Sequence, residues 1–552
     1  MILISGAGPS GLVLALTLRK NDIPVRIIDK EPRPRLGERG AGVSPRSLEL
    51  HKILGTFADI YGSGGALPLR KEYDPLDAHK AVKIYPVIPI GEPTIGAPYV
   101  NPLLLGQNHH EQILRSHLEA LGTHVEFGTE LRSFTQSNGS VDVELIHHGS
   151  DGKEEVEHVN VPWLIGTDGA HSIIRKALGF DFLGETRVEH EVVIGDIRTT
   201  SGPREFWERW GDPKSKIIMT RSSAQEPDVL TFMTAGRQSD SSALLANPQA
   251  IIDEFYSISG RHDIVLKEVI WCSMYRPNIR MVSKLRSGRV FIAGDAAHCH
   301  SPAGGQGLNS SIQDVFNLGW KLALVEKGYA SESLLDTYAE ERLPVIAEML
   351  NKTTELLDER LSAVTSTIVK PDQGDDIRAD MTQLGINYRG STILFEEGVQ
   401  KDPSVVKLAG YSKGSIDGAL PGDRAPEAPK LIDDADATHE VSLYDILSPS
   451  RHTIVIFGDG YSVDVLDALS QAIRRQPENT IYGVLLRRSH DASSIGPDKN
   501  FDKTLTDSEG HAYAGYKAGG PCAVIVRPDG TIGARVFSAA GLESYFKGIF
   551  GA

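Results

Sequence analysis

The first thirty residues constrain the fold most, because they combine a strand, a glycine-rich turn, a helix and a second strand that ends in an acid. An apolar run at 1–5 precedes the GAGPSG turn at 6–11, and residues 12–20 read as a helix. A second apolar run ends at Asp29, 18 residues after Gly11. This order and spacing are typical of a βαβ unit that binds a dinucleotide. They predict a Rossmann-like α/β fold for the N-terminal part of the chain.

Each residue type in this unit has a physical role. Gly6 allows a tight turn, Gly8 lets the backbone approach a pyrophosphate, and Gly11 lets the helix pack closely on the strand. The free N–H groups at the helix N-terminus attract phosphate. Asp29 can accept hydrogen bonds from a ribose and would repel a 2′-phosphate. The unit therefore favours FAD or NAD over NADP, and by itself it does not separate FAD from NAD.

Two later segments, 164–175 and 288–309, favour a flavin. In the second, a strand-like run at 290–293 delivers Asp295 at its end, and a glycine-rich turn and a helix from about residue 310 follow. A strand-end acid can hold a ribityl hydroxyl. The turn and the helix N-terminus can face a flat, partly anionic ring.

With the N-terminal turn, these segments resemble the three fingerprints of the FAD-dependent aromatic hydroxylases, which are single-component flavoprotein monooxygenases. Shorter matches at 39–49, 107–114, 317–322 and 338–344 extend the resemblance over residues 1–350. It implies FAD as cofactor, with NADPH or NADH as a transient reductant. The cofactor contacts, carried over position by position, fall at Gly6, Gly8, Gly11, Asp29, Lys30, Arg39, Gln107, Asp168, Asp295, Pro302, Gly305, Gly307, Leu308 and Asn309.

The resemblance also implies a reaction. The enzyme would use NAD(P)H and O₂ to hydroxylate a phenolic or polycyclic aromatic compound through a flavin hydroperoxide. Epoxidation or Baeyer–Villiger insertion on a polyketide-like substrate would use the same oxidant and stays open. Outside this class, an NAD-dependent dehydrogenase would leave residues 295–309 unexplained, and a non-catalytic flavin-binding scaffold would show no NAD(P)H oxidation. The substrate, its regiochemistry and the choice between NADH and NADPH stay open.

Four strand-like runs between the second and third fingerprints predict a β-sheet substrate domain: 192–196, 216–220, 229–234 and 269–274. Tyr275 follows the last run, where phenol hydroxylase has an active-site tyrosine, so it is the catalytic candidate; the alternative is a sheet tyrosine with a surface hydroxyl. Phenol hydroxylase also has an acid in the segment matching 39–43, where this chain has none, which argues against simple phenol. Trp207 and Trp210 could wall a substrate pocket or pack at the edge of the sheet.

The expected domain division follows from these segments. Residues 1–185 and 285–370 would form a discontinuous FAD-binding domain, and 186–284 with about 76–100 the substrate domain. A linker at 371–415 would lead to a C-terminal domain at 416–552, whose element order resembles a thioredoxin fold and the extra domain of the phenol hydroxylase and aromatic polyketide hydroxylase branch. It has no CxxC pair, and Cys522 stands alone. We therefore expect a structural or dimerisation role, which leaves a homodimer open.

The composition limits the classes of binding partner that we expect. Lys and Arg number 57 against 73 Asp and Glu, a net charge of −16 that argues against nucleic acid and anionic membranes. Three cysteines without a CxxC pair argue against a disulfide framework and a cysteine-rich zinc site. The metal-like run 298–300 lies inside the third fingerprint, so no metal is expected. No run approaches the roughly 18 apolar residues of a membrane span. A small aromatic substrate, O₂ and a reducing, cytoplasmic location are expected.

Overall fold

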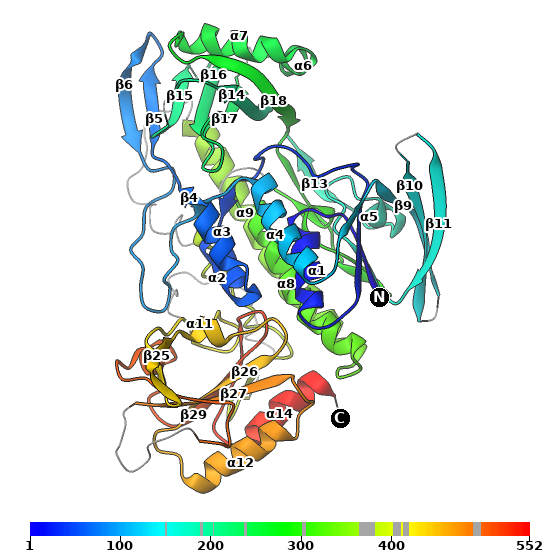
Figure 1. Ribbon diagram of the computed structural model, residues 1–552, viewed down its shortest axis with the longest axis vertical. Coiled ribbons are helices and arrows are strands. Elements are labelled where there is room, and N and C mark those ends of the chain that lie inside the picture. Colours follow the sequence, from blue (N-terminus) through cyan, green and yellow to red (C-terminus); the bar gives the residue numbers. More distant parts are fainter. Residues whose placement is uncertain are drawn as a thin grey trace.

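The computed structural model describes residues 1–137, 139–149, 152–187, 191–202, 204–212, 214–236, 240–300, 305–363, 381–400, 410–411, 419–488 and 498–551 (Figure 1). A seven-stranded sheet and a C-terminal unit lie at opposite ends of the molecule, with a nucleotide-type α/β unit between them. None of the helices in these ranges is both long and apolar enough to cross a membrane.

The central unit confirms the expected Rossmann-like fold. Its six-stranded sheet has the order β20-β21-β12-β1-β2-β8. All its strands are parallel except the edge strand β20. Their bounds are β1 Ile2–Ser5, β2 Val25–Asp29, β8 Val125–Phe127, β12 Leu164–Gly166, β20 Arg286–Ser287 and β21 Val290–Ile292. Because parallel strands end at the same edge, the segments that follow β1, β12 and β21 converge there.

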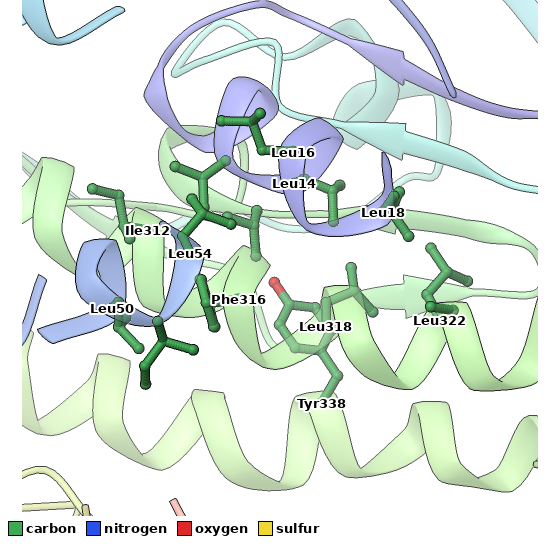
Figure 2. Close-up of a cluster of buried hydrophobic side chains, with 14 of the residues drawn as sticks. Leu14, Leu16, Leu18, Leu50, Leu54, Ile312, Phe316, Leu318, Leu322 and Tyr338 are labelled. Atoms are coloured by element: carbon green, nitrogen blue, oxygen red, sulfur yellow. The ribbon is translucent and has the colours of Figure 1, made fainter. Parts of the chain in front are cut away.

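Helix α1 (Pro9–Arg19) is buried along most of its length because it lies between this sheet and α8 (Gly307–Glu326). The two helices approach so closely that a Cβ on Gly319 would lie 2.7 Å from the methyl group of Thr17. Figure 2 shows leucines of α1 facing apolar side chains of α8, with α2 (Pro45–Leu54) and α9 (Asp336–Ala363) closing the cluster. This core holds the amino-terminal ends of α1 and α8 in place.

The seven-stranded sheet has the order β18-β14-β17-β16-β15-β5-β6. Its strands are β5 Arg70–Asp74, β6 Asp77–Tyr85, β14 Val192–Thr199, β15 Trp207–Gly211, β16 Ile217–Ser222, β17 Val229–Ala235 and β18 Leu266–Tyr275. The four strands predicted between the fingerprints are thus confirmed as β14, β16, β17 and β18. The N-terminal segment enters this sheet at Arg70, ahead of the residue-76 start expected from the sequence.

The two faces of this sheet differ. One face packs an apolar core against α6 (Ser241–Ala246) and α7 (Pro248–Ser259). Trp210 belongs to that core, 1% exposed and stacked on Tyr73, so it packs the sheet and does not line the opposite face. The register places on the opposite face, here called the inner face, Ile194, Asp196, Arg209, Met219, Arg221, Thr231, Met233, Trp271, Ser273 and Tyr275.

Smaller sheets and helices complete the N-terminal part. A three-stranded meander is made by β9 (Thr129–Ser137), β10 (Ser140–His148) and β11 (Glu154–Val161). The other short elements are β3 Gly42–Val43, α3 Phe57–Ser63, β4 Gly65–Ala66, β7 Leu103–Leu104, α4 Gln107–Ala120, α5 Ile173–Ala177, β13 Leu183–Thr186, β19 Asn278–Met281 and β22 His298–Cys299.

The C-terminal unit contains an eight-stranded sheet of order β23-β30-β29-β26-β27-β28-β24-β25. Its central strands and helices follow the expected order β26 His452–Phe457, α12 Val463–Arg474, β27 Ile481–Arg487, β29 Cys522–Val526, β30 Ile532–Val536 and α14 Ala539–Phe550. The remaining elements are β23 Phe395–Glu396, β24 Leu431–Asp433, β25 Asp436–Val441, α11 Leu443–Ile446, β28 Lys503–Thr506 and α13 His511–Gly515. The thioredoxin-like assignment stays a prediction, as does the division into domains. About half of the expected linker lies outside the described residues.

Candidate functional site

The glycine-rich turn after β1 leaves no room for side chains at two of its three glycines. Gly6 has a φ of +105°, and a Cβ there would lie 2.3 Å from the carbonyl oxygen of Thr167. A Cβ on Gly11 would lie 2.0 Å from the carbonyl oxygen of Gly6. At Gly8 a Cβ would meet nothing within 4 Å. The space in front of Gly8, at the N-terminus of α1, is therefore open to a ligand phosphate.

Asp29 ends β2 and braces this turn. Its Oδ2 accepts a hydrogen bond from the Ala7 amide at 2.8 Å, and its Oδ1 accepts one from the Glu31 amide at 3.0 Å. Each carboxylate oxygen keeps a further lone pair that could accept from a ribose hydroxyl. The neighbouring Lys30 is exposed.

Asp168 and Asp295 lie at the same sheet edge. Asp168 follows β12, and its Oδ2 accepts from the amides of Ile173 and Ile174 at the start of α5. Its Oδ1 is buried without a hydrogen-bond partner among the described residues, and burial raises the pKa of the carboxyl group. Asp295 follows β21 and is exposed, and within the described chain no group bonds its carboxylate. Both acids thus have acceptor oxygens free for a ligand.

The turn before α8 carries the next group of predicted residues. Gly305, Gly307 and Leu308 lie at the N-terminal end of α8, and Pro302 lies outside the described residues. Asn309 was predicted to contact the cofactor, but its side chain bonds the protein backbone. Its Nδ2 donates to the carbonyl oxygens of Gly42 and Gly305, each at 2.9 Å, and its Oδ1 accepts from the amide of Ser44. Its side chain therefore ties the 42–44 segment to the turn and leaves the backbone of the turn for the ligand.

The loop around Arg39 joins the nucleotide unit to the inner face. Arg39 is exposed, has a φ of +40° and places its guanidinium 4.9 Å from the centre of the Trp271 ring. Burial of part of the group, and then the charge of Arg35, lower the pKa of Arg39. Gln107 begins α4, where its amide donates to the carbonyl oxygen of Glu38 and its side chain donates to Glu111 at 2.8 Å. Arg39 and Gln107 therefore lie close to one another beside the loop.

A buried ionic cluster supports the turn that follows Asp295. His298 Nε2 and Asp314 Oδ2 lie 2.6 Å apart, and Arg342 Nε donates to Asp314 Oδ1 at 2.7 Å. Gly294 N also donates to Asp314. Although burial opposes its charge, His298 and Arg342 keep the pKa of Asp314 below its ordinary value. His298 is thus bonded to a structural acid, and the described residues contain no cluster of three or more metal-type ligands.

Tyr275 ends β18 and reaches the same turn. Its hydroxyl donates to the carbonyl oxygen of His300 at 3.0 Å. Burial, followed by the charge of Asp295, raises the pKa of Tyr275 well above its ordinary value. The phenol therefore stays protonated at neutral pH and acts as a hydrogen-bond donor. Tyr275 lies beside the predicted cofactor segment, and its hydroxyl is not at the surface of a distant sheet edge.

Sequence reasoning missed a second cluster at the same junction. Glu38, from the loop, pairs with Arg221 of β16 at 2.7 Å, and its amide donates to Asp196 Oδ2 of β14 at 2.8 Å. Trp271 Nε1 donates to the same Asp196 oxygen. The sheet register brings Asp196, Arg221 and Trp271 to one face, and the packing of the loop adds Glu38. The one available signal was Asp196, an acid that follows an apolar run in its strand.

The residues present fit FAD. The open space at Gly8, the free acceptors on Asp168 and Asp295, and the two helix N-termini lie around one sheet edge, as a phosphate-bearing ligand with hydroxyl groups requires. The inner face lies against that edge through Tyr275 and through the Glu38 cluster. A second ligand could therefore be held between the sheet and a flavin.

Comparisons with known proteins agree with this geometry. A family model described as an FAD binding domain matches residues 1–353. A flavin-dependent monooxygenase of Mycobacteroides abscessus is 35% identical over 492 residues, which cover 88% of this chain and 94% of that protein. Pentachlorophenol 4-monooxygenase of Sphingobium chlorophenolicum is 29% identical over 559 residues, 98% of this chain and 94% of the relative.

A solved structure supports the fold over the full length. The ternary complex of aklavinone-11 hydroxylase with FAD and aklavinone superposes with a TM-score of 0.78 at 21% identity, covering 100% of this chain and 99% of that one. The match to the FAD binding domain extends over more than half of the 552 residues, and all three predicted fingerprints lie within it. The chain therefore belongs to the FAD-dependent aromatic hydroxylase family of flavoprotein monooxygenases.

Proposed function

We propose that this protein uses FAD, NAD(P)H and O₂ to hydroxylate a phenolic or polycyclic aromatic compound. The observation that carries the proposal is the contact between the inner face and the predicted cofactor segments. Tyr275 bonds the backbone after Asp295, and Asp196 bonds the backbone of the loop that carries Arg39. An aromatic ring held on the inner face would therefore lie next to the flavin.

The chain's own residues would bind and orient the cofactor, which when bound supplies the redox and oxygen-transfer chemistry. Asp29 and Asp295 would accept hydrogen bonds from ribose and ribityl hydroxyls. The N-termini of α1 and α8 would stabilise negative charge on the pyrophosphate and on the ring. Gly8 would allow the pyrophosphate to approach the backbone. Arg39, Gln107, Asp168 and the residues from Gly305 to Asn309 would complete the contacts.

The substrate side of the site combines apolar and aromatic groups with a protonated phenol. Ile194, Met219 and Met233 line the inner face beside Ser273 and Tyr275. Such a surface suits an aromatic ring, since ring faces and methionine side chains pack well against each other. The one hydroxyl hydrogen of Tyr275 is donated to the His300 carbonyl oxygen, so the Tyr275 oxygen would accept a hydrogen bond from a substrate hydroxyl group and orient the ring. The named relatives act on pentachlorophenol and on aklavinone, which supports a phenolic or polycyclic compound.

The C-terminal unit would serve structure or dimerisation. Burial raises the pKa of Cys522, which lies in β29 and pairs in register with Phe457. Thiol–disulfide exchange needs an accessible thiolate, so this thiol is not suited to it. A homodimer formed through this unit is part of the proposal.

The decisive experiment begins with the purified protein, which should be yellow and release FAD on denaturation. Phenols, quinols and polycyclic aromatics are then screened for stimulated NAD(P)H oxidation under O₂, with products identified by mass and NMR. A new hydroxyl group on the ring supports the proposal. An epoxide or a ring-expanded ester would indicate the alternative oxygenase reactions. Oxidation of the substrate with reduction of NAD(P)⁺ and without O₂ would indicate a dehydrogenase. No NAD(P)H oxidation with any ligand would indicate a scaffold.

A further inference from the structure

Arg221 of β16 lies on the inner face, which the proposed function takes as the substrate wall. Its side chain is 6% exposed, and its Nη1 lies 2.7 Å from Oε2 of Glu38, which is 3% exposed. Thr231 Oγ1 donates to the same carboxylate oxygen at 3.1 Å. A buried arginine in a ligand site is well suited to hold a substrate carboxylate. Here a carboxylate of the protein itself already occupies that position.

Asp196 adds a second carboxyl group to this corner. Its Oδ2 accepts from Glu38 N and from Trp271 Nε1, at 2.8 and 2.5 Å. Asp196 Oδ1 and Glu38 Oε1 are buried and have no hydrogen-bond partner among the described residues. Burial raises the pKa of Asp196, and the charge of Glu38 adds to this shift. The corner thus places two carboxyl groups beside one arginine, whose Nη1 lies at ion-pair distance from Glu38 without an aligned hydrogen bond among the described residues.

A second arginine of the inner face is neutralised in the same way. Arg209 of β15 pairs with Glu72 of β5 at 2.9 Å, and Glu72 also accepts from the hydroxyl of Tyr85. A substrate carboxylate entering the Arg221 corner could only accept hydrogen bonds, and it would meet one or two negative charges of the protein. It would lose its hydration without gaining an unpaired cation.

We propose that Glu38 makes the site selective for aromatic substrates that carry no carboxylate on the part facing Arg221. This inference rests on the proposed function, because it takes the inner face as the substrate wall. The favoured substrates are neutral phenols and neutral polycyclic aromatics. Hydroxybenzoate-type acids are excluded, because the ion pair has filled the position that would recognise them.

The test measures binding to the FAD-loaded protein by isothermal titration calorimetry, so it does not depend on turnover. The probes are 6-hydroxy-2-naphthamide and 6-hydroxy-2-naphthoate, which share ring and shape and differ in charge. The wild-type protein should bind the amide at least about tenfold more tightly. Glu38→Gln keeps the side-chain shape and frees Arg221, so the amide-to-acid ratio of affinities should fall by about 10- to 100-fold, as expected for a hydrogen bond to a charged group.

Glu254→Gln is the matched control. Glu254 lies on α7, on the far side of the sheet, where it pairs with Lys216 at 2.7 Å. The change in net charge is the same but the arginines of the inner face stay paired, so the ratio should stay within about threefold of wild type. Combining Glu38→Gln with Arg221→Gln should remove the acid binding that Glu38→Gln gains. If Glu38→Gln does not retain FAD, Asp196→Asn removes the other carboxylate of the corner and should lower the ratio in the same direction.

Three results would contradict the inference. A wild-type protein that binds the acid as well as the amide overturns the inference, and so does a ratio unchanged by Glu38→Gln. An equal effect of Glu254→Gln would assign the selectivity to overall charge and would also overturn it. Failure of the wild-type holoprotein to bind either probe counts against an aromatic substrate on the inner face, and therefore against the proposed function itself.

Discussion

At the scale of single residues, the contacts of Tyr275 suit it to orient the substrate. Its hydroxyl donates to the His300 carbonyl at 3.0 Å, and its raised pKa keeps the proton in place. Tyr275→Phe keeps the ring and removes the hydroxyl group that would orient the substrate, so FAD should still bind. Hydroxylation should fall by roughly 10²-fold, the lower range for losing a positioned proton-handling group. The measurement compares product formed with NAD(P)H consumed, which should uncouple and release hydrogen peroxide.

Tyr256→Phe is the control for that variant. Tyr256 also donates to a backbone carbonyl, that of Ile264 at 3.0 Å, but it lies on α7, which covers the far side of the sheet. Its removal should leave coupling unchanged. If Tyr275→Phe keeps full coupling and rate, Tyr275 only packs, and the substrate is oriented by other groups of the inner face.

Asp295 tests the cofactor side of the site. Its exposed carboxylate follows β21 and has no bonding partner in the described chain, so its role depends on a ligand. Asp295→Ala should weaken FAD binding by about 10- to 100-fold, since hydrogen bonds to charged groups contribute about 1.5–3 kcal/mol. Titration of the apoprotein with FAD measures this, with Asp253→Ala, an exposed acid on α7, as control. FAD affinity equal to wild type would exclude Asp295 as a ribityl acceptor.

At the scale of elements, the sequence predicted those strands and helices whose apolar pattern and flanking turn residues lie within the segment itself. β16 matches its predicted run at 216–220 to within two residues at each end, and β17 extends its run at 229–234 by one residue. Helix α8 begins at Gly307, earlier than residue 310, because a glycine turn gives no capping signal. β6 was missed because its residues are mostly exposed and do not alternate. The Glu38–Arg221 pair depends on how the loop packs against the sheet, which no local pattern encodes.

The turn after β1 allows stability and ligand binding to be separated. Gly8 has φ −72° and ψ −176°, a conformation that any residue adopts, and a Cβ there meets open space. Gly8→Ala should therefore leave the melting temperature of the apoprotein unchanged and still weaken FAD binding, because the methyl group enters the space of the pyrophosphate. Gly11→Ala should lower both, since its Cβ would lie 2.0 Å from the Gly6 oxygen. Overpacking of this kind costs about 1–3 kcal/mol.

Thermal denaturation of the two apoproteins, followed by FAD titration, distinguishes these outcomes. A Gly8→Ala protein with wild-type affinity would mean that the cofactor does not approach this turn. A Gly11→Ala protein as stable as wild type would mean that the turn relaxes around the methyl group.

At the scale of the whole molecule, the C-terminal unit is joined to the nucleotide unit through buried charges. Glu341 of α9 accepts from Lys321 of α8 at 2.7 Å and from Arg527, which follows β29, at 2.7 Å, and all three side chains are 0% exposed. Arg424 reaches Glu49 of α2 at 3.0 Å in the same way. These pairs connect the helix that begins at the predicted flavin turn to the C-terminal sheet. Docking of the C-terminal unit should therefore contribute to the stability of the cofactor site.

Glu341→Gln tests this connection. Removing one partner of a buried ion pair costs about 3–5 kcal/mol, so the free energy of unfolding in urea should fall by that amount at pH 7. Despite burial, Arg527 and Lys321 hold the pKa of Glu341 below its ordinary value. A carboxyl group with a lowered pKa stabilises the fold above its unfolded pKa of about 4.3, and this contribution is lost as pH falls towards the folded pKa. The difference between wild type and variant should therefore shrink below about pH 5.

Glu332→Gln provides the comparison at the surface. Glu332 pairs with Arg286 and Arg289 at 3.1 and 2.6 Å, but its side chain is 48% exposed, so solvent screens the interaction. Its loss should cost less than about 1 kcal/mol at any pH. Urea titrations of the three proteins from pH 7 to pH 4 give the required curves. If Glu341→Gln costs no more than Glu332→Gln, or if its cost does not change with pH, the buried charges do not hold the two units together, and the apolar core between them must do so.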